Sequence, residues 1–325
     1  MKVKRYRQLA VVALLTFILS TAVARAQTPL VVPKPVTAWP DVFWVQEGYR
    51  AEVRTEKVMS QMMAREMPFR IILPDGYSLP VNDSKRLPVV YLLHGLTGHF
   101  SNWTDKTELA QYAARHNLIV VTPEGDDGWY TDSTAKSNDK YESYIVKELI
   151  PEVDKKFRTI ANRDHRAIAG LSMGGYGSIK FGLKYPEMFV VVGSFSGALG
   201  AASITEKVIP GAIGRSIDAI FGQAGSDTRK SNDIFDLIRK STPDKIKAFP
   251  FLYLDCGTED FLFQNNRDFV DLLVEKKVPH EFRELPGGHN WTYWNAQVEE
   301  FLELAYKRFA AGNKVESGGD RRSLQ

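Results

Sequence analysis

One stretch near the middle of the chain, residues 166–177, constrains the fold more than any other. Its sequence, RAIAGLSMGGYG, predicts a short buried strand, a sharp turn that carries Ser172, and a helix of small residues. Gly170 and Gly174 stand two residues before and two residues after the serine. A side chain at either position would collide across so tight a turn, so glycine suits both. The helix would point its N-terminus, with free N–H groups and a partial positive charge, toward the serine. The pattern therefore predicts a serine nucleophile displayed above the edge of a sheet.

Strand-like and helix-like segments alternate along residues 49–311, which predicts one domain. Dense apolar runs such as 87–93 have the length of strands that are covered on both faces. The predicted strands are 51–57, 67–73, 87–93, 118–122, 165–169, 189–195, 250–255 and 281–285, and helices are predicted at 108–116, 141–157, 178–185, 265–276 and 293–309. This alternation predicts an α/β fold with a mainly parallel, doubly wound sheet and helices on both faces. Residues 196–244 break the rhythm, so we expect an insertion there over the active site.

Five polar loops are expected to meet at one edge of this sheet. In doubly wound sheets the ligand lies beyond the carboxyl ends of the parallel strands. The loops that follow predicted strands contain the serine turn, His94-Gly95, Trp129, Gly257 and Gly288. Segments far apart in the sequence should therefore build one site.

A catalytic serine needs a base, and the base needs a carboxylate that orients it. Where a serine stands on such a strand-to-helix turn, the acid and then the histidine follow it along the chain. Two histidines follow Ser172. His280 opens an alternating strand and is expected at the surface, whereas His289 occupies a flexible turn in the sequence PGGHNW. We therefore predict that His289 is the base.

The orienting carboxylate is expected after the strand 250–255. Asp255 belongs to that strand, while Glu259 and Asp260 follow the turn at Gly257. Asp260 is favoured, because a loop carboxylate past the turn can reach the imidazole. Glu259 is the alternative acid, and its other interpretation is a solvated loop charge.

Two backbone N–H groups are expected to stabilise the negative oxygen that forms when the serine attacks. One belongs to Met173, directly after the serine. The other should come from the loop after His94-Gly95, where we expect Leu96 to supply it. His94 itself is interpreted as a structural brace of this loop.

Aromatic side chains near these loops are candidates for contact with the substrate. Trp129, Tyr130 and Trp291 could form walls for a sugar or an aromatic group, and packing at the rim of the sheet is an equally good interpretation. The sequence has no histidine–carboxylate spacing typical of a metal site and no phosphate-binding glycine loop. We therefore expect neither a metal nor another cofactor.

Residues 1–26 have the composition of a cleavable signal peptide. A basic start is followed by a nearly continuous apolar run at 9–23 and by the small-x-small sequence Ala24-Arg25-Ala26. We expect cleavage near Ala26-Gln27 and export to the periplasm or the medium. The apolar run is short for a membrane span, so stable membrane insertion is not expected after cleavage, and a retained anchor is the alternative.

Export changes what the charge balance means. Residues 1–26 carry five cations and no acids, so their removal changes the formal net charge from +3 to −2 and leaves no reason to expect a nucleic-acid partner.

Residues 27–48 contain four prolines and predict an extended leader, and residues 312–325 predict a disordered tail. Cys256 is the only cysteine, which excludes an intramolecular disulfide, and we expect it to be a small buried residue.

Five short motifs occur together along the chain: HGLTG at 94–98, WYTDS at 129–133, GLSMGG at 170–175, GTEDFL at 257–262 and GHNW at 288–291. In combination they resemble the esterase D (putative esterase) family of α/β-hydrolases, over roughly residues 67–309. That family includes feruloyl and acetyl-xylan esterases, tributyrin esterases, S-formylglutathione hydrolases and the antigen 85 mycolyltransferases. The resemblance implies an α/β-hydrolase fold. It also implies a nucleophile, acid, base and two oxyanion-hole positions at Ser172, Asp260, His289, Leu96 and Met173.

The residues and the resemblance together predict an exported serine carboxylesterase. Its expected substrates are esters of small acyl or cinnamoyl (feruloyl-type) groups, including such groups carried on carbohydrate. An acyltransferase with the same triad is the alternative, since sequence does not separate water from a sugar hydroxyl as the acceptor. A non-catalytic carbohydrate-binding protein is disfavoured by the intact serine, acid and histidine.

Overall fold

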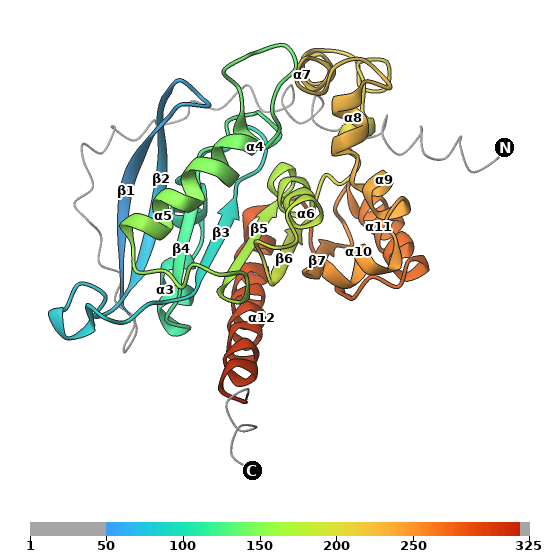
Figure 1. Cartoon of the computed structure of the whole chain (residues 1–325). Coiled ribbons are helices and arrows are strands. Elements are labelled where there is room, and N and C mark those ends of the chain that lie inside the picture. Colours follow the sequence, from blue (N-terminus) through green and yellow to red (C-terminus); the bar gives the residue numbers. More distant parts are fainter. Residues whose placement is uncertain (1–49, 319–325) are drawn as a thin grey trace, which may run out of the picture.

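An eight-stranded sheet forms the centre of the computed structural model, which describes residues 50–318 (Figure 1). The strands are β1 (Ala51–Ser60), β2 (Arg65–Pro74), β3 (Val89–Leu93), β4 (Ile119–Pro123), β5 (Arg166–Leu171), β6 (Val191–Phe195), β7 (Phe251–Gly257) and β8 (His280–Leu285). Their order is β1-β2-β4-β3-β5-β6-β7-β8. β2 pairs antiparallel with β1 and β4, and the pairs from β4 to β8 are parallel. The predicted mainly parallel sheet is confirmed, and each predicted strand is present.

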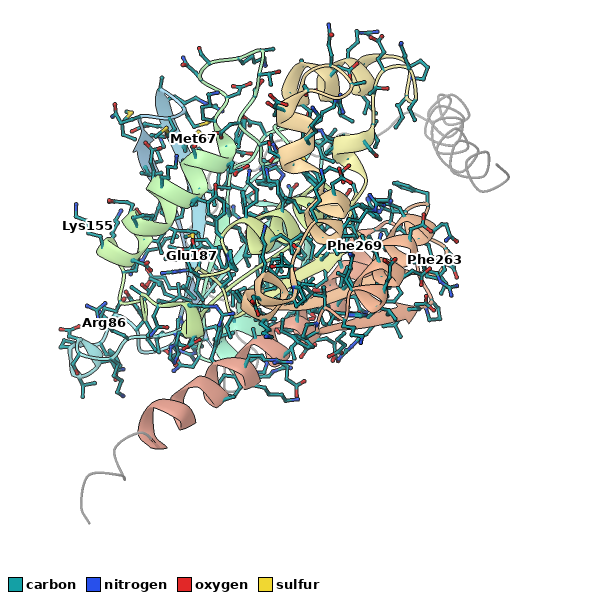
Figure 2. The ribbon with its side chains drawn as sticks, turned by 45° about the vertical axis from the view of Figure 1, so that its right-hand side comes forward. Met67, Arg86, Lys155, Glu187, Phe263 and Phe269 are labelled. Atoms are coloured by element: carbon teal, nitrogen blue, oxygen red, sulfur yellow. The ribbon has the colours of Figure 1, made fainter. Side chains whose placement is uncertain are left out.

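Helices cover both faces of this sheet, which explains why β3 and β4 are buried along their whole length. One face carries α4 (Tyr141–Tyr144), the π-helical turn η2 (Ile145–Leu149), α5 (Ile150–Lys156), α6 (Met173–Lys184) and α11 (Phe263–Glu275). The other carries α2 (Asn102–Lys106), α3 (Leu109–Arg115) and α12 (Trp291–Gly318) (Figure 1). In Figure 2, Met67 and Lys155 mark the β2 and α5 side of the molecule, and Phe263 and Phe269 mark α11. Each face has its own buried apolar cluster.

The segment predicted as one helix at 141–157 contains a wider turn in its middle. The chain is α-helical in α4, π-helical in η2 and α-helical again in α5. Pro151 has no N–H to donate to the carbonyl of Lys147, so the regular ladder of helical hydrogen bonds is interrupted here. Periodicity alone does not reveal such an interruption.

The last helix is longer than predicted. α12 runs from Trp291 to Gly318, whereas the sequence predicted a helix at 293–309 and a disordered tail from residue 312. Residues 310–318, AAGNKVESG, mix good helix formers with glycine, Asn313 and Val315, so local propensity does not explain the extension. Residues 319–325, the predicted signal peptide at 1–26 and the predicted leader at 27–48 lie outside the described residues. Among residues 50–318, no helix has both the length and the apolar composition that a membrane span requires.

Between β6 and β7 the chain leaves the sheet and forms short helices. They are η4 (Ala201–Ser203), α7 (Ala212–Phe221), α8 (Asp227–Asn232), α9 (Ile234–Arg239) and α10 (Pro243–Ala248); the single turns η1 (Pro80–Asn82) and η3 (Arg163–His165) lie elsewhere. The side chains of Ser226, Asp233 and Thr242 accept backbone N–H groups from the first turns of α8, α9 and α10. The region starts against the serine turn, because Ala198 N–H donates to Ser172 O at 2.9 Å. Its placement over the active site stays a prediction.

Candidate active site

The serine turn has the strained geometry that its sequence predicts. Ser172 lies between the end of β5 and the start of α6, with φ 52° and ψ −113°. Such a conformation costs a non-glycine residue about 1–3 kcal/mol and is concentrated at functional sites. A Cβ added to Gly170 would lie 2.5 Å from the carbonyl carbon of Gly174, and one added to Gly174 would lie 2.7 Å from the carbonyl oxygen of His94. Only glycine therefore fits on either side of the serine.

Hydrogen bonds join the loops at the carboxyl ends of the strands. They connect the serine turn to the end of β6, that end to β7, the loop after β7 to the loop after β8, and the loop after β4 to the loop after β3. The bonds are Ser172 N–H to Phe195 O, Ser196 N–H to Asp255 O, Glu259 N–H to Gly287 O and Tyr130 O–H to His94 O, between 2.8 and 2.9 Å long. β3 also pairs in parallel with β5, with Leu93 opposite Gly170, so the five loops named from the sequence meet at one edge.

His289 and Asp260 form a close pair at this edge. The Nδ1 atom of His289 lies 2.9 Å from Oδ2 of Asp260, whose side chain is fully buried, while 19% of the His289 side chain is exposed. The other carboxylate oxygen accepts the N–H of Leu262 at 2.8 Å. A carboxylate at Nδ1 favours the tautomer that carries its proton there, which leaves Nε2 free to accept one. The neighbouring Glu259 is exposed, so the structure pairs the histidine with Asp260.

The serine and the histidine are on the same edge without a direct hydrogen bond. The bonds made by residues 50–318 do not include one between the Ser172 hydroxyl and the His289 ring. In free enzymes such contacts are often long and tighten only when substrate is bound. The roles of Ser172 as nucleophile and of His289 as base stay predictions.

Aromatic rings surround the His289 imidazole. The ring of Phe261 lies 4.5 Å from it between centroids, and the Trp294 ring meets it edge-on at 4.9 Å. The Trp294 Nε1–H donates to Ser196 Oγ at 3.3 Å, which ties this ring to the end of β6. Phe261 is 47% exposed and was given no role from the sequence, although it directly follows the predicted acid. Phe261 is thus an exposed aromatic ring beside the predicted base.

The two predicted oxyanion donors belong to the loop after β3 and to the start of α6. Leu96 is half-buried in residues 94–98, which we call the oxyanion loop, and Met173 is the first residue of α6. The hydrogen bonds of the described chain use neither of these two backbone N–H groups. Both are therefore available to a developing negative charge.

His94 braces the oxyanion loop from inside. Its Nδ1 lies 2.8 Å from Gly95 O, and its Nε2 lies 3.0 Å from Oε1 of Glu124 and accepts the N–H of Gly125 at 2.9 Å. Burial alone would raise the pKa of Glu124. Hydrogen bonding and charge from His94, with the N–H groups of Asp126 and Phe100, instead lower it to about 2. The structural role predicted for His94 is thus supported by its contacts.

The aromatic residues predicted as substrate walls mainly contact protein. Trp129 is 5% exposed and Tyr130 is 0% exposed, which favours the packing alternative for both. Trp291 is half-buried, with Lys106 Nζ 5.2 Å from its ring centroid and the Trp103 ring edge-on at 5.4 Å. Contact between Trp291 and substrate stays a prediction.

Cys256 is buried as predicted, and burial raises the pKa of its thiol. Across residues 50–318, no group of three or more His, Cys, Asp or Glu side chains is arranged to hold a metal ion.

Comparison with known proteins places these features in context. The family model described as "Putative esterase" matches residues 60–303. The acetyl esterase of Caldicellulosiruptor saccharolyticus is 31% identical over 233 residues, which cover 69% of this chain and 85% of that protein. The S-formylglutathione hydrolase of Mus musculus is 28% identical over 256 residues, covering 70% of this chain and 83% of that protein. A solved ferulic acid esterase matches with a TM-score of 0.70 and 28% identity, covering 81% of this chain and all (100%) of the other.

Proposed function

This chain belongs to the esterase family of α/β-hydrolases and is a carboxylic ester hydrolase, and on that premise we propose that Ser172, His289 and Asp260 form its catalytic triad. One observation carries the proposal. The buried carboxylate of Asp260 holds Nδ1 of His289 at the same edge of the sheet where Ser172 stands in a strained turn.

The proposed reaction passes through an acyl-enzyme. The Ser172 hydroxyl attacks the ester carbonyl while Nε2 of His289 takes its proton, and Asp260 stabilises the imidazolium that forms. The N–H groups of Leu96 and Met173 stabilise the tetrahedral oxyanion. The intermediate collapses when the alcohol leaves with the proton from His289. Water, deprotonated by His289, then attacks the acyl group in the same way and releases the carboxylic acid and the free serine.

We propose small acyl and cinnamoyl esters, including those carried on carbohydrate, as the substrates. The names of the relatives support this range, because an acetyl esterase and a ferulic acid esterase are both similar to this chain. The exposed ring of Phe261 beside the base supports an aromatic or flat acyl group. The composition of residues 1–26 supports export to the periplasm or the medium.

Hydrolysis of a panel of esters tests the proposal. p-Nitrophenyl acetate, butyrate and octanoate, methyl ferulate and acetylated xylan are compared with wild type, Ser172→Ala and the exposed control Ser231→Ala. We expect Ser172→Ala to lower kcat by about 10⁵-fold or more, and Ser231→Ala to leave it unchanged. Product analysis with an added sugar distinguishes hydrolysis from acyl transfer. Full turnover by folded Ser172→Ala would overturn the assignment of the nucleophile.

A further inference from the structure

Tyr130 connects two loops on the oxyanion side of the site. It lies in the loop after β4, its side chain is 0% exposed, and its hydroxyl donates to the carbonyl oxygen of His94 at 2.9 Å. His94 begins the oxyanion loop, so this bond fixes the first peptide plane of the segment that presents the N–H of Leu96. The hydroxyl thus acts on backbone two residues from an expected oxyanion donor.

The oxyanion loop has to be held without using that N–H. Other groups of the loop make the bonds: Tyr130 donates to His94 O, Nδ1 of His94 and the N–H of Gly98 lie 2.8 and 3.0 Å from Gly95 O, and the N–H of Thr97 donates to Oδ1 of Asp127 at 2.6 Å. A loop held at His94, Gly95, Thr97 and Gly98 keeps the N–H of Leu96 free for the substrate. The hydroxyl of Tyr130 therefore supplies a contact of the kind that the oxyanion loop needs.

Tyr130 is itself held in an unusual conformation. Trp129 and Tyr130 have φ values of 52° and 50°, which are uncommon for bulky side chains and persist only where the surroundings impose them. Lys180 of α6 supplies that constraint: its buried Nζ donates to Tyr130 O at 2.6 Å and to Thr131 Oγ1 at 2.8 Å. The same ammonium pairs with Glu142 at 2.9 Å. The helix that carries the nucleophile thus also fixes the loop that carries Tyr130.

The surrounding chain leaves space for the Tyr130 ring. A Cβ added to Gly177 of α6 would lie 2.7 Å from Cδ2 of the ring, and one added to Gly125 would lie 2.7 Å from its Cζ. The Tyr130 hydroxyl has a protein partner, whereas the buried hydroxyls of Tyr91 and Tyr144 have none among the described residues. The bond from Tyr130 to His94 is therefore a specific feature of this position.

We propose that Tyr130 is a positioning residue for the oxyanion loop, acting through its hydroxyl, and that Lys180 holds Tyr130 in place. The inference rests on the proposed function, because it assigns to Leu96 the stabilisation of the oxyanion. The sequence left open whether Tyr130 contacts substrate or packs at the rim of the sheet. In this proposal Tyr130 fixes backbone and does not contact substrate.

Tyr130→Phe tests the proposal against the matched control Tyr144→Phe, which removes a buried hydroxyl that makes no hydrogen bond. Both variants are assayed with p-nitrophenyl acetate, and active sites are counted by titration with a p-nitrophenyl phosphonate, so that kcat refers to folded enzyme. Loss of an oxyanion donor costs about 10²–10³ in kcat, and a displaced donor should cost less, so we expect kcat to fall about tenfold in Tyr130→Phe. Acylation and deacylation both pass through an oxyanion, so KM should change less than twofold. Tyr144→Phe should keep wild-type values.

Three outcomes would overturn the proposal. They are an unchanged kcat in Tyr130→Phe, a rise in KM at constant kcat, or an equal loss of kcat in the control. If Tyr130→Phe does not fold, the double variant Lys180→Met, Glu142→Gln removes the buried ion pair and should still lower kcat with little change in KM. An unchanged kcat in this double variant would also overturn the proposal. Ser172→Ala in the same series shows whether the proposed function itself has failed.

Discussion

Two regions flank Ser172 in the proposed site, and different kinds of interaction hold them. On the oxyanion side, buried polar groups hold the backbone: Tyr130, His94 and Glu124 form a hydrogen-bonded chain around the oxyanion loop. On the base side, one hydrogen bond to Asp260 orients His289, and the rings of Phe261 and Trp294 pack around it. One side is buried and polar, and the other is partly exposed and aromatic.

The difference follows from what each side does in the proposed reaction. A backbone N–H stabilises an oxyanion only if it is fixed before charge develops, and buried hydrogen bonds to the loop provide that rigidity. An imidazole that takes and returns a proton needs its Nε2 open to substrate and alcohol. Packing by rings that leave 19% of the His289 side chain exposed suits that requirement. Substitutions on the oxyanion side should therefore change kcat, and those at the exposed rim of the base side should change KM.

The largest effect in this comparison is expected from Asp260→Asn. An amide no longer holds the productive tautomer of His289, so kcat should fall by about 10³–10⁴-fold with little change in KM. The matched control is Glu259→Gln, which changes the exposed neighbour and should stay within about twofold of wild type. Steady-state kinetics with p-nitrophenyl acetate measure both. A large loss in Glu259→Gln with activity kept in Asp260→Asn would transfer the role to the other carboxylate.

Most of the fold was predictable because its elements have strong local signals. Buried strands such as β3 and β4 are continuous apolar runs bounded by loops, and the serine turn needs glycine at Gly170 and Gly174. The helices between β6 and β7 were mostly missed, because six-residue helices such as α8 and α10 have too few turns to show periodicity. Their starts depend on caps such as Ser226.

The site was predictable where chemistry fixes the residue types. A serine turn followed by a loop acid and a loop histidine named the pair that the structure brings together, Asp260 and His289. The hydrogen bonds that hold the oxyanion loop were not all predicted. Tyr130 and Lys180 are 50 residues apart in the sequence, and their bond depends on how a loop with positive φ folds. An aromatic residue after a strand has the same sequence pattern whether it is exposed or buried, which is why Tyr130 was a candidate wall.

A smaller effect, on stability, should also appear on the oxyanion side. Burial alone would raise the pKa of Glu142, but the ammonium groups of Lys180 and Lys184 lower it to about 2. The folded pKa of Glu142 lies below the ordinary value of 4.5, so the carboxylate stabilises the fold above pH 4.5, and this contribution is lost as the pH falls toward about 2. Glu142→Gln leaves two buried or half-buried cations without their partner and should lower the free energy of unfolding at pH 7 by about 3 kcal/mol.

Urea unfolding at pH 7, 4.5, 3.5 and 2.5 measures this effect. The wild type should lose stability steadily below pH 4.5, and Glu142→Gln should show a shallower loss, because the group that takes up the proton is gone. Glu275→Gln, at an exposed position of α11, is the control and should follow the wild type. If Glu142→Gln has the same free energy of unfolding as the wild type at pH 7 and loses the same amount as the pH falls, the contact of Glu142 with Lys180 and Lys184 does not stabilise the fold.

The smallest effect is expected from Phe261→Ala, and it bears most directly on the contrast between the two sides. Phe261 is 47% exposed, and its ring lies 4.5 Å from that of His289, so a flat acyl group bound at the serine would meet it. An aromatic contact of this kind contributes about 0.5–1.5 kcal/mol, so KM for methyl ferulate should rise about threefold to tenfold, while kcat for p-nitrophenyl acetate stays within about twofold. Tyr306→Ala, at an equally exposed residue (47%) of α12, should leave both unchanged. If Phe261→Ala instead lowers kcat for both esters equally, the ring orients His289 rather than the acyl group, and the base side would depend on buried support as much as the oxyanion side does.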